Sequence, residues 1–316
     1  MRRLRIPAVA AALCCAAVAA GCGLGPGSET GSATMSITRD YGALTVADSF
    51  DFEAKQSDTV LRVLDGNADI TTRYGGRFVQ SIGGIESGVR DGQRFDWFFY
   101  VNGVESSLGA ADVSITDGDR IWWDYRDWNA AMRVPAVVGS FPEPFKHGFG
   151  GRQYATRIDC VGTMPPCQTA RRALESEGVS AGVFSAGQAP GVDAESAPTL
   201  RVIVGPWSAV GRDRAAALIE HGPAQSGVFA RFDGGKLVLL NARGQAAERF
   251  GSGAGLVAAV RLNEAPPTWI ITGTDKAGVA AAAALFETSD LQDHYAVAAT
   301  PNTAPEPLPV SPSGQP

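Results

Sequence analysis

Two aromatic segments, each bordered by a turn signal, constrain the fold of this chain more than any other feature. The segment Phe95–Val101 runs directly into Asn102-Gly103, and the segment Arg120–Arg126 directly follows Asp-Gly-Asp. Asn-Gly accepts the positive φ angles of a tight hairpin, and both segments are rich in residues that favour strands. Four of the six Trp residues lie in or beside these segments. We therefore expect an antiparallel sheet whose strands carry aromatic side chains.

The alternation of side chains along a strand places aromatic residues on both faces of this sheet. A small domain needs one buried face, so the other face would bring aromatics near solvent, where they would form a platform for a flat ligand or a partner. The alternative is that a helix on one side and loops on the other bury both faces. The candidate ligand-binding residues are Trp97, Phe99, Tyr100, Asn102, Trp122, Trp123, Tyr125 and Trp128.

The segments around these strands are expected to complete a small α+β domain at about residues 37–134. Apolar residues at helical spacing predict a short helix over Thr59–Asp65, and short apolar runs predict strands over Phe50–Ala54 and Phe78–Ile82. This region therefore predicts a β-rich domain with one helix.

The stretch from about Thr59 to Trp128 is similar to the transcobalamin-like C-terminal domain, which occurs in exported and lipid-anchored bacterial proteins of unassigned function. The similar segments, in order, are TVLRVLD, YGGRFVQSIGG, FDWFFYVNG and GAADVSITDGDRIWWDY. In the vitamin B12 carriers of animals this domain forms one wall of the cobalamin site. A separate helical barrel, which has no counterpart in this sequence, forms the other wall. The resemblance therefore implies a corrinoid-like ligand as a candidate.

The first 22 residues have the pattern of a bacterial lipoprotein signal. Three Arg precede an uncharged run from Ile6 to Ala20, and this run is shorter than the about 20 apolar residues that span a bilayer. Val18–Cys22 resembles a lipobox, with Ala19 where Leu is commoner. We therefore expect residues 1–21 to be removed and Cys22 to carry lipid at the extracytoplasmic face of the cell membrane. The alternative is an ordinary secretory signal that is cut nearby.

Two segments of biased composition are expected to flank the folded part. Residues 22–36 are rich in Gly, Ser and Thr and predict a flexible tether, whereas residues 301–316 contain six Pro and predict a disordered tail. The formal charge of the whole chain is −6. Loss of the signal arginines makes the mature chain more acidic, so we expect no nucleic-acid partner.

The five cysteines leave one pair in the mature chain. Cys14 and Cys15 would leave with the signal and Cys22 would carry lipid, so Cys160 and Cys167 remain. We interpret this pair as a disulfide, because exported proteins fold in an oxidising compartment. Metal ligation and a redox dithiol are the alternatives. No His or further Cys lies close enough in sequence to complete a zinc site, and the spacing is not C-x-x-C.

Residues 135–300 predict a second, separate domain of the α/β layered class. Strands that alternate with helices are the basis for this prediction. The Pro- and Gly-rich segment at 135–151 is expected to be the linker or an extended entry to this domain. The expected helices are Gln168–Glu177, Ser208–His221 and Asp275–Thr288, the expected buried strands are Leu200–Val204 and Thr268–Thr272, and a hairpin is expected from Val228–Phe232 and Lys236–Asn241.

Motifs of catalytic, metal and cofactor sites are missing from the sequence. No H-E-x-x-H, G-x-S-x-G or P-loop occurs, and His147, His221 and His294 are far apart. His147 is expected to be a satisfied surface residue. The ends of the two buried strands, at Gly205 and Gly273, lie where α/β sheets bind ligands, although ordinary strand-to-helix capping also explains them.

These observations predict a protein without enzymatic activity, metal or cofactor. The predicted function is that of a membrane-anchored protein that binds a flat nutrient, with a corrinoid as the candidate, and that serves an importer. The alternative is a structural or interaction module that binds cell-wall polymer or a protein partner.

Overall fold

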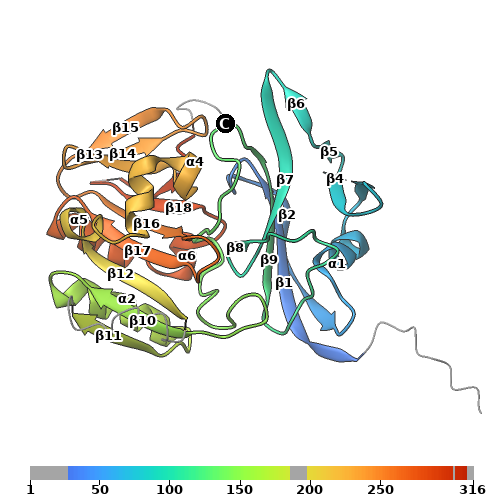
Figure 1. Cartoon of the computed structure of the whole chain (residues 1–316), viewed down its shortest axis with the longest axis horizontal. Coiled ribbons are helices and arrows are strands. Elements are labelled where there is room, and N and C mark those ends of the chain that lie inside the picture. Colours follow the sequence, from blue (N-terminus) through green and yellow to red (C-terminus); the bar gives the residue numbers. More distant parts are fainter. Residues whose placement is uncertain (1–27, 186–197, 302, 312–316) are drawn as a thin grey trace, which may run out of the picture.

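The computed structural model describes residues 28–185, 198–301 and 303–311. Two large sheets lie side by side, one in the N-terminal half of the chain (residues 29–127) and one in the C-terminal half (residues 155–310) (Figure 1). The predicted signal peptide and Cys22 lie outside the described residues. Within the described ranges, no helix is long and apolar enough to cross a bilayer.

The N-terminal half is built around the predicted aromatic strands. Its elements are β1 (Glu29–Arg39), β2 (Leu44–Lys55), α1 (Val60–Asn67), β3 (Ile70–Arg73), β4 (Phe78–Ile82), β5 (Ile85–Glu86), β6 (Gly88–Arg90), β7 (Gln93–Val101), β8 (Val104–Glu105) and β9 (Arg120–Asp127). Its main sheet has the order β2-β1-β9-β7-β6, with β8 paired to β7, while β3, β4 and β5 form a small sheet. The predicted helix and strands are confirmed. Asn102 and Gly103 have φ angles of 53° and 74° and form the predicted hairpin turn.

The residues predicted as a tether form most of strand β1 instead. β1 lies between β2 and β9 and pairs with β9 in parallel. Met35 and Ile37 are buried in the core of the N-terminal half. The tether prediction is therefore wrong for residues 29–36. Two apolar residues among Gly, Ser and Thr are too few to predict a strand from the sequence. The strands that pair with β1 are distant from it in the sequence.

The C-terminal half is a seven-stranded sheet covered on both faces. Its elements are β10 (Ala155–Cys160), α2 (Met164–Ser176), β11 (Ala181–Ser185), β12 (Thr199–Pro206), α3 (Trp207–Val210), the 3-10 helix η1 (Ala216–His221), α4 (Pro223–Ser226), β13 (Ala230–Asp233), β14 (Lys236–Leu240), β15 (Ala246–Phe250), β16 (Gly255–Val260), β17 (Thr268–Gly273), α5 (Lys276–Ala284), α6 (Thr288–Leu291), β18 (Ala296–Ala299) and β19 (Glu306–Leu308). The sheet order is β11-β10-β12-β17-β16-β18-β19. β11, β10, β12 and β17 run in parallel, and α2 and α5 cover one face. This arrangement agrees with the predicted α/β layer.

The helix predicted over Ser208–His221 is broken in two. α3 ends at Val210, and at the next residue, Gly211, an added Cβ would lie 2.9 Å from the Trp207 ring. Asp213 then accepts hydrogen bonds from the backbone N–H groups of Ala215 (2.9 Å) and Ala216 (3.3 Å), so a new turn starts there. Asp213 is fixed by its ion pair with Arg201 of β12 (2.8 Å). A contact distant in sequence therefore interrupts a locally regular helical pattern.

Two further predictions at the C-terminal end are wrong. The helix predicted to reach Thr288 ends at Ala284, and Phe286 turns into the core against Phe141 and Trp269. The tail predicted to be disordered contains β19, which pairs with β18, and Leu308 and Val310 are buried. An apolar residue between prolines was sufficient to attach this segment at a sheet edge, where proline is tolerated.

The disulfide between Cys160 and Cys167 is confirmed. It joins the end of β10 to the first turns of α2, with the two Cα atoms 5.9 Å apart. Both sulfurs lie in the core that α2 and α5 form with the sheet. The bond therefore fixes the first crossover of the parallel sheet.

The two halves share one hydrophobic core, so the prediction of two separate domains is not confirmed. Tyr100 and Trp122 of the N-terminal half lie in the same cluster as Phe229 and Tyr295 of the C-terminal half. The segment at 135–151, predicted as a linker or an extended entry, is also packed, since Phe141 and Phe145 are buried in the core of the C-terminal half. The seam between the two sheets is therefore part of the folded interior.

Candidate functional site

One aromatic face of the β7–β9 pair lies in the core of the N-terminal half. Trp97, Trp123 and Tyr125 are buried there. The Trp97 indole donates a hydrogen bond to the Ile85 carbonyl (2.9 Å), and the Tyr125 hydroxyl donates to the Glu86 carbonyl (2.8 Å). Phe99 is half-buried, with its ring centroid 4.9 Å from that of Trp123. The shared role of these residues is to pack the small sheet and α1 against the main sheet.

The opposite aromatic face is covered by the C-terminal half. Tyr100 and Trp122 are both fully buried, and Tyr295 packs against both rings with centroid distances of 5.7 and 5.2 Å. The expectation that one face is open to a flat ligand is therefore wrong. Trp128 is half-buried at the end of β9, where its indole donates to Asp96 (2.7 Å).

A buried carboxylate organises the seam beside these rings. Asp124 accepts hydrogen bonds from the Thr38 hydroxyl (2.6 Å), the Gly42 and Tyr41 backbone N–H groups (3.0 and 3.1 Å) and the Tyr295 hydroxyl (2.9 Å). Burial raises the pKa of Asp124 to about 6, although these donors oppose the rise. Asp124 therefore links β9 and the β1–β2 turn to the C-terminal half.

A buried arginine lies on the same face of β9. The Arg126 guanidinium donates to the carbonyls of Ala131 (2.7 Å) and Met132 (3.3 Å) and lies 3.7 Å from the centroid of the Phe98 ring. Arg126 is fully buried. A planar cation whose terminal nitrogens donate to carbonyls and whose plane lies over an aromatic ring is a structural element of the seam.

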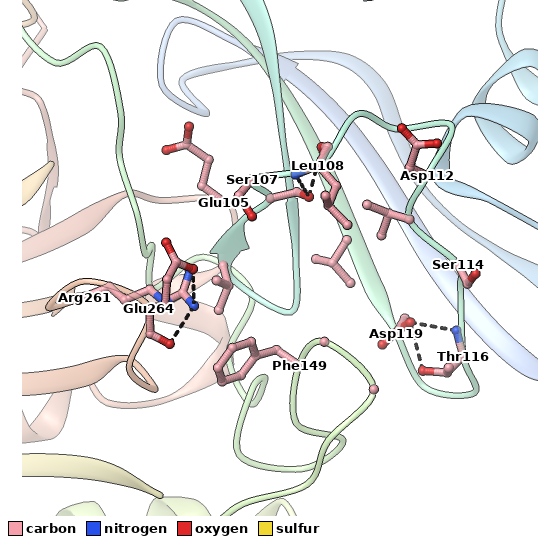
Figure 2. A pocket seen from close by; sticks show the side chains of 16 residues that line it. Glu105, Ser107, Leu108, Asp112, Ser114, Thr116, Asp119, Phe149, Arg261 and Glu264 are labelled. Atoms are coloured by element: carbon pink, nitrogen blue, oxygen red, sulfur yellow. Dashed lines mark hydrogen bonds and ion pairs between the residues drawn. The ribbon is translucent and has the colours of Figure 1, made fainter. Parts of the chain in front are cut away.

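An open cavity of about 420 Å³, which we call the seam cleft, lies where β8 and the start of β9 meet the C-terminal half (Figure 2). Both halves and the segment that connects them contribute walls. The lining residues are Val101, Val104, Glu105, Ser106, Ser107, Leu108, Asp112, Val113, Ser114, Thr116 and Asp119 of the N-terminal half, Phe149, Gly150 and Gly151 of the connecting segment, and Arg261 and Glu264 of the C-terminal half. Cavities of this size hold small organic ligands.

Phe149 and Arg261 form a fixed wall of the seam cleft. The Phe149 ring is stacked on Tyr154 with centroids 4.8 Å apart, and the Arg261 guanidinium lies 5.5 Å from its centroid. Arg261 also donates to the Ala265 carbonyl (2.9 Å) and pairs with Glu264 (3.1 Å). The guanidinium is therefore already occupied by protein partners.

Asn102 holds the two walls of the seam cleft together. Its side-chain amide donates to Asp119 on one wall (2.8 Å) and to the Gly148 carbonyl beside the other (2.7 Å), and its oxygen accepts from the Arg120 backbone N–H (2.8 Å). Asn102 is fully buried. The sequence predicted Asn102 as a turn residue that contacts a ligand. The structure shows it as a buried turn residue whose side chain connects the two walls behind the cleft.

Asp119 is a buried carboxylate at the edge of the seam cleft. It accepts hydrogen bonds from the Thr116 backbone N–H (2.7 Å) and hydroxyl (3.0 Å) (Figure 2). It also accepts a hydrogen bond from Asn102. Burial raises the pKa of Asp119 against these hydrogen bonds. Its charge is thus satisfied by neutral donors.

His147 lies next to the seam cleft and is paired with a buried carboxylate. Glu143 accepts hydrogen bonds from the His147 backbone N–H (2.9 Å) and interacts with ring Nδ1 (2.5 Å). Burial raises the pKa of Glu143 in spite of this partner. The ring packs so closely on Gly118 that an added Cβ there would lie 2.5 Å from it. The predicted surface histidine is therefore satisfied, but by an interior group.

The residues around the seam cleft supply both polar and apolar contact surface. Among the described residues, His147 makes no hydrogen bond to a Ser, Thr or Cys side chain, so no activated nucleophile is assembled beside it. Within the same ranges, no three His, Cys, Asp or Glu side chains gather closely enough to hold a metal ion. The arrangement offers an apolar wall, several hydroxyl groups and carboxylates to a small molecule.

The strand ends of the C-terminal half offer less space. Gly205, Pro206 and Lys276 line a cavity of about 50 Å³ between β12 and α5. The Asp275 side chain caps α5 by accepting from the Gly278 N–H (2.9 Å) and also accepts from Ser252 (2.5 Å). Ordinary capping therefore explains this strand end, and the helix N-terminus is already supplied with an anion.

Sequence reasoning missed the walls of the seam cleft. Phe149 and Arg261 belong to no recognisable motif and are 112 positions apart in the chain. The one available signal was the Gly-rich run after His147, because glycines allow backbone to approach a ligand or another chain segment closely. That run was assigned to a linker.

Comparisons with known proteins bear on the N-terminal half. Residues 57–127 match the family model described as a domain of unknown function, DUF4430. A protein of Ruminococcus gnavus ATCC 29149, described as a candidate metal binding protein, is 16% identical over 31% of this chain and 97% of its own, with a TM-score of 0.24. Haptocorrin in complex with Cbi is 14% identical over 31% of this chain and 25% of its own, with a TM-score of 0.25. No curated protein matches the chain. Residues 57–127 are thus similar to a domain whose function is unknown.

Proposed function

We propose that this chain is an exported, lipid-anchored protein without enzymatic activity that binds a small molecule in the seam cleft. The observation that carries the proposal is the cleft itself, a cavity of about 420 Å³ whose apolar and polar walls come from both halves of the chain, which share a hydrophobic core. The lipobox at Cys22 supports the location. The seam cleft replaces the aromatic faces as the candidate site, because those faces are buried.

The start of β1 determines how close the seam cleft lies to the proposed membrane anchor. Seven residue steps separate Cys22 from Glu29, so the chain between them reaches at most about 25 Å. The first part of β1 is tied to the turn beside the cleft, since the Ser32 backbone N–H donates to Asp117 (2.9 Å). The cleft would therefore lie near the membrane surface, within reach of an importer subunit.

The anchor is tested by replacing Cys22 with Ser. The expected result is release of the protein from the membrane fraction and loss of the lipid mass on the N-terminal peptide. A Cys160→Ser variant, which keeps Cys22, serves as the control and should stay in the membrane fraction. Retention of the Cys22→Ser protein in the membrane would contradict lipid anchoring.

The binding site is tested by filling the seam cleft. Ser107 is exposed on its rim, so Ser107→Trp is expected to block the cavity without changing the fold. Calorimetric titration should compare cobalamin, cobinamide and smaller nutrients against both proteins. A corrinoid is included because of the sequence resemblance of the N-terminal half. Binding that is equal in the two proteins would place the ligand elsewhere and would overturn the seam cleft as the site.

A structural or interaction module is the second candidate function. The observation that favours it is the complete burial of Tyr100 and Trp122, which shows that these aromatics serve packing. Sedimentation with purified cell wall would test it. Co-sedimentation that Ser107→Trp leaves unchanged, together with no small-molecule binding, would favour this candidate over ligand capture.

A further inference from the structure

The charges that line the seam cleft are unbalanced. Four carboxylate residues line it, and Arg261 is the one cation among its described lining residues. Arg261 is committed to Glu264 and to the carbonyls of Glu264 and Ala265 at 2.9 to 3.1 Å, and its side chain is 8% exposed. An anionic ligand would therefore find no free positive group in this cavity.

The four carboxylates differ in their availability. Glu105 accepts from the Val134 backbone N–H (2.6 Å) and faces Arg133 (3.6 Å), while Asp119 is held by Thr116 and Asn102. Asp112 is exposed, and within the described ranges its side chain makes no hydrogen bond or ion pair. Figure 2 shows it on the rim opposite Arg261. Asp112 is therefore the carboxylate that is free to contact a ligand.

The rest of the lining indicates the other parts of the ligand. Val104, Leu108, Val113 and the edge of Phe149 supply apolar surface, and Leu108 is 58% exposed although it is a large apolar residue. The hydroxyl groups of Ser106, Ser107 and Ser114 supply weak donors and acceptors. A bare metal ion does not fit this lining, because the described residues bring no three ligating groups together.

We propose that the ligand of the seam cleft is an organic cation, an ammonium group attached to an apolar body, with the charge beside Asp112 and the body against Leu108 and Phe149. This inference rests on the proposed function and names the class of its ligand. Asp112 has no cationic partner among the described residues, and the buried Asp119 is held by neutral donors. This negative charge attracts such a group, because the cleft is partly shielded from water and counterions. The acidic net charge of the chain acts in the same direction.

The test uses three probes of similar shape and different charge, namely 2-phenylethylammonium, 2-phenylethanol and 3-phenylpropionate. Each is titrated into the mature chain and followed by saturation-transfer NMR. The ammonium is expected to bind at least about fivefold more tightly than the alcohol, and Asp112→Asn should remove about fivefold of the ammonium affinity while sparing the alcohol. Asp65→Asn is the matched control, because Asp65 is exposed on α1 away from the cleft. It should leave all three affinities unchanged.

The outcomes separate the ligand class from the site. The proposal of a cationic ligand is contradicted if Ser107→Trp blocks binding but the alcohol or the carboxylate binds as tightly as the ammonium. It is also contradicted if Ser107→Trp blocks binding and Asp112→Asn has no effect. In both cases the seam cleft remains the binding site. If no probe binds at millimolar concentration, or if Ser107→Trp changes nothing, both the cation and the seam cleft are overturned.

Discussion

The two faces of the β7–β9 pair carry similar aromatic residues but are used differently. The face toward α1 buries Trp97, Trp123 and Tyr125 among aliphatic side chains of the same half. The face toward the C-terminal half combines Tyr100 and Trp122 with the charged residues Asp124 and Arg126, all fully buried. Apolar packing suffices within one half of the chain. At the seam, directional polar contacts also fix how the β7–β9 face docks on the C-terminal half. A buried charge is stable only when its hydrogen-bond partners lie in a suitable geometry.

The largest effect should come from removing one indole from each face. Trp122→Ala is expected to lower the free energy of unfolding by about 3–5 kcal/mol and to separate the unfolding of the two halves, because Trp122 lies in their shared core. Trp123→Ala should lower the free energy of unfolding by a similar amount, but it should destabilise only the N-terminal half, whose core contains Trp123. Guanidinium unfolding followed by fluorescence and by far-UV circular dichroism measures both. Coincident, single transitions for Trp122→Ala would contradict the distinction.

The seam should also show a pH dependence that the apolar face lacks. The pKa of Asp124 is raised from 3.8 to about 6 in the folded chain. Between these values the folded state keeps a proton that the unfolded state has lost, so the free energy of unfolding falls as pH rises and levels off above about 6. The contribution of Asp124 is about 3 kcal/mol at most.

Asp124→Asn isolates this contribution. Urea unfolding between pH 4 and 7 should show a decline in the native protein that is smaller in the variant. Other buried carboxyl groups with raised pKa values, such as Asp119 and Glu143, contribute equally to both proteins. Parallel profiles for the two proteins would show that Asp124 does not titrate in this range.

Two phenols at the seam should differ because one contacts a carboxylate and the other does not. The Tyr295 hydroxyl donates to Asp124 (2.9 Å), and the Tyr100 hydroxyl donates to Tyr295 (3.2 Å). Tyr295→Phe is expected to cost about 2 kcal/mol of unfolding free energy and Tyr100→Phe about 1 kcal/mol. A double-mutant cycle of the two substitutions measures their coupling. Equal costs would mean that the contact with Asp124 adds nothing.

The smallest effect is expected at the rim of the apolar face. Arg90 of β6 lies 5.4 Å from the centroid of the Tyr125 ring and is exposed to solvent. Arg90→Ala should cost about 0.5 kcal/mol, since an exposed cation–π contact is weak. Arg73 of β3 is exposed and stacks on no ring of the described residues, so Arg73→Ala is the control and should cost less. Thermal unfolding measures the stability loss of each variant. Equal losses for Arg90→Ala and Arg73→Ala would show that the cation–π contact does not contribute to stability.

The elements that the sequence indicated correctly are those whose signals are local. β4 was predicted with its observed bounds, and β7, β9 and the Asn102-Gly103 turn follow from alternation and from tolerance of positive φ. β1 and β19 were not predicted, because each has only a few apolar residues and gains its order from strands far away in the chain. The prediction of one helix over Ser208–His221 was wrong for the opposite reason. Its local pattern is regular, but the ion pair between Asp213 and Arg201 of β12 interrupts the helix.

The candidate site was less accessible to sequence reasoning than the fold. All eight predicted ligand-binding residues are buried or half-buried. Of these eight, Asn102 adjoins the seam cleft, where its side chain connects the two walls. Asp112 belongs to no recognised motif, and its candidate role follows only from its position opposite Phe149 and Arg261 across the seam cleft. A cavity between distant segments leaves no periodic pattern in the sequence.

The sequence by itself determined the strand pair, its turns and the disulfide, because each depends on residues that are close together in the chain or on composition. Only the tertiary structure decided what covers the second aromatic face. Alternation shows that Tyr100 and Trp122 point away from Trp97 and Trp123, but it does not say whether water, a ligand or protein lies there. The contact between the two halves answers this, because Tyr295 and Asp124 bring together positions that are 171 residues apart.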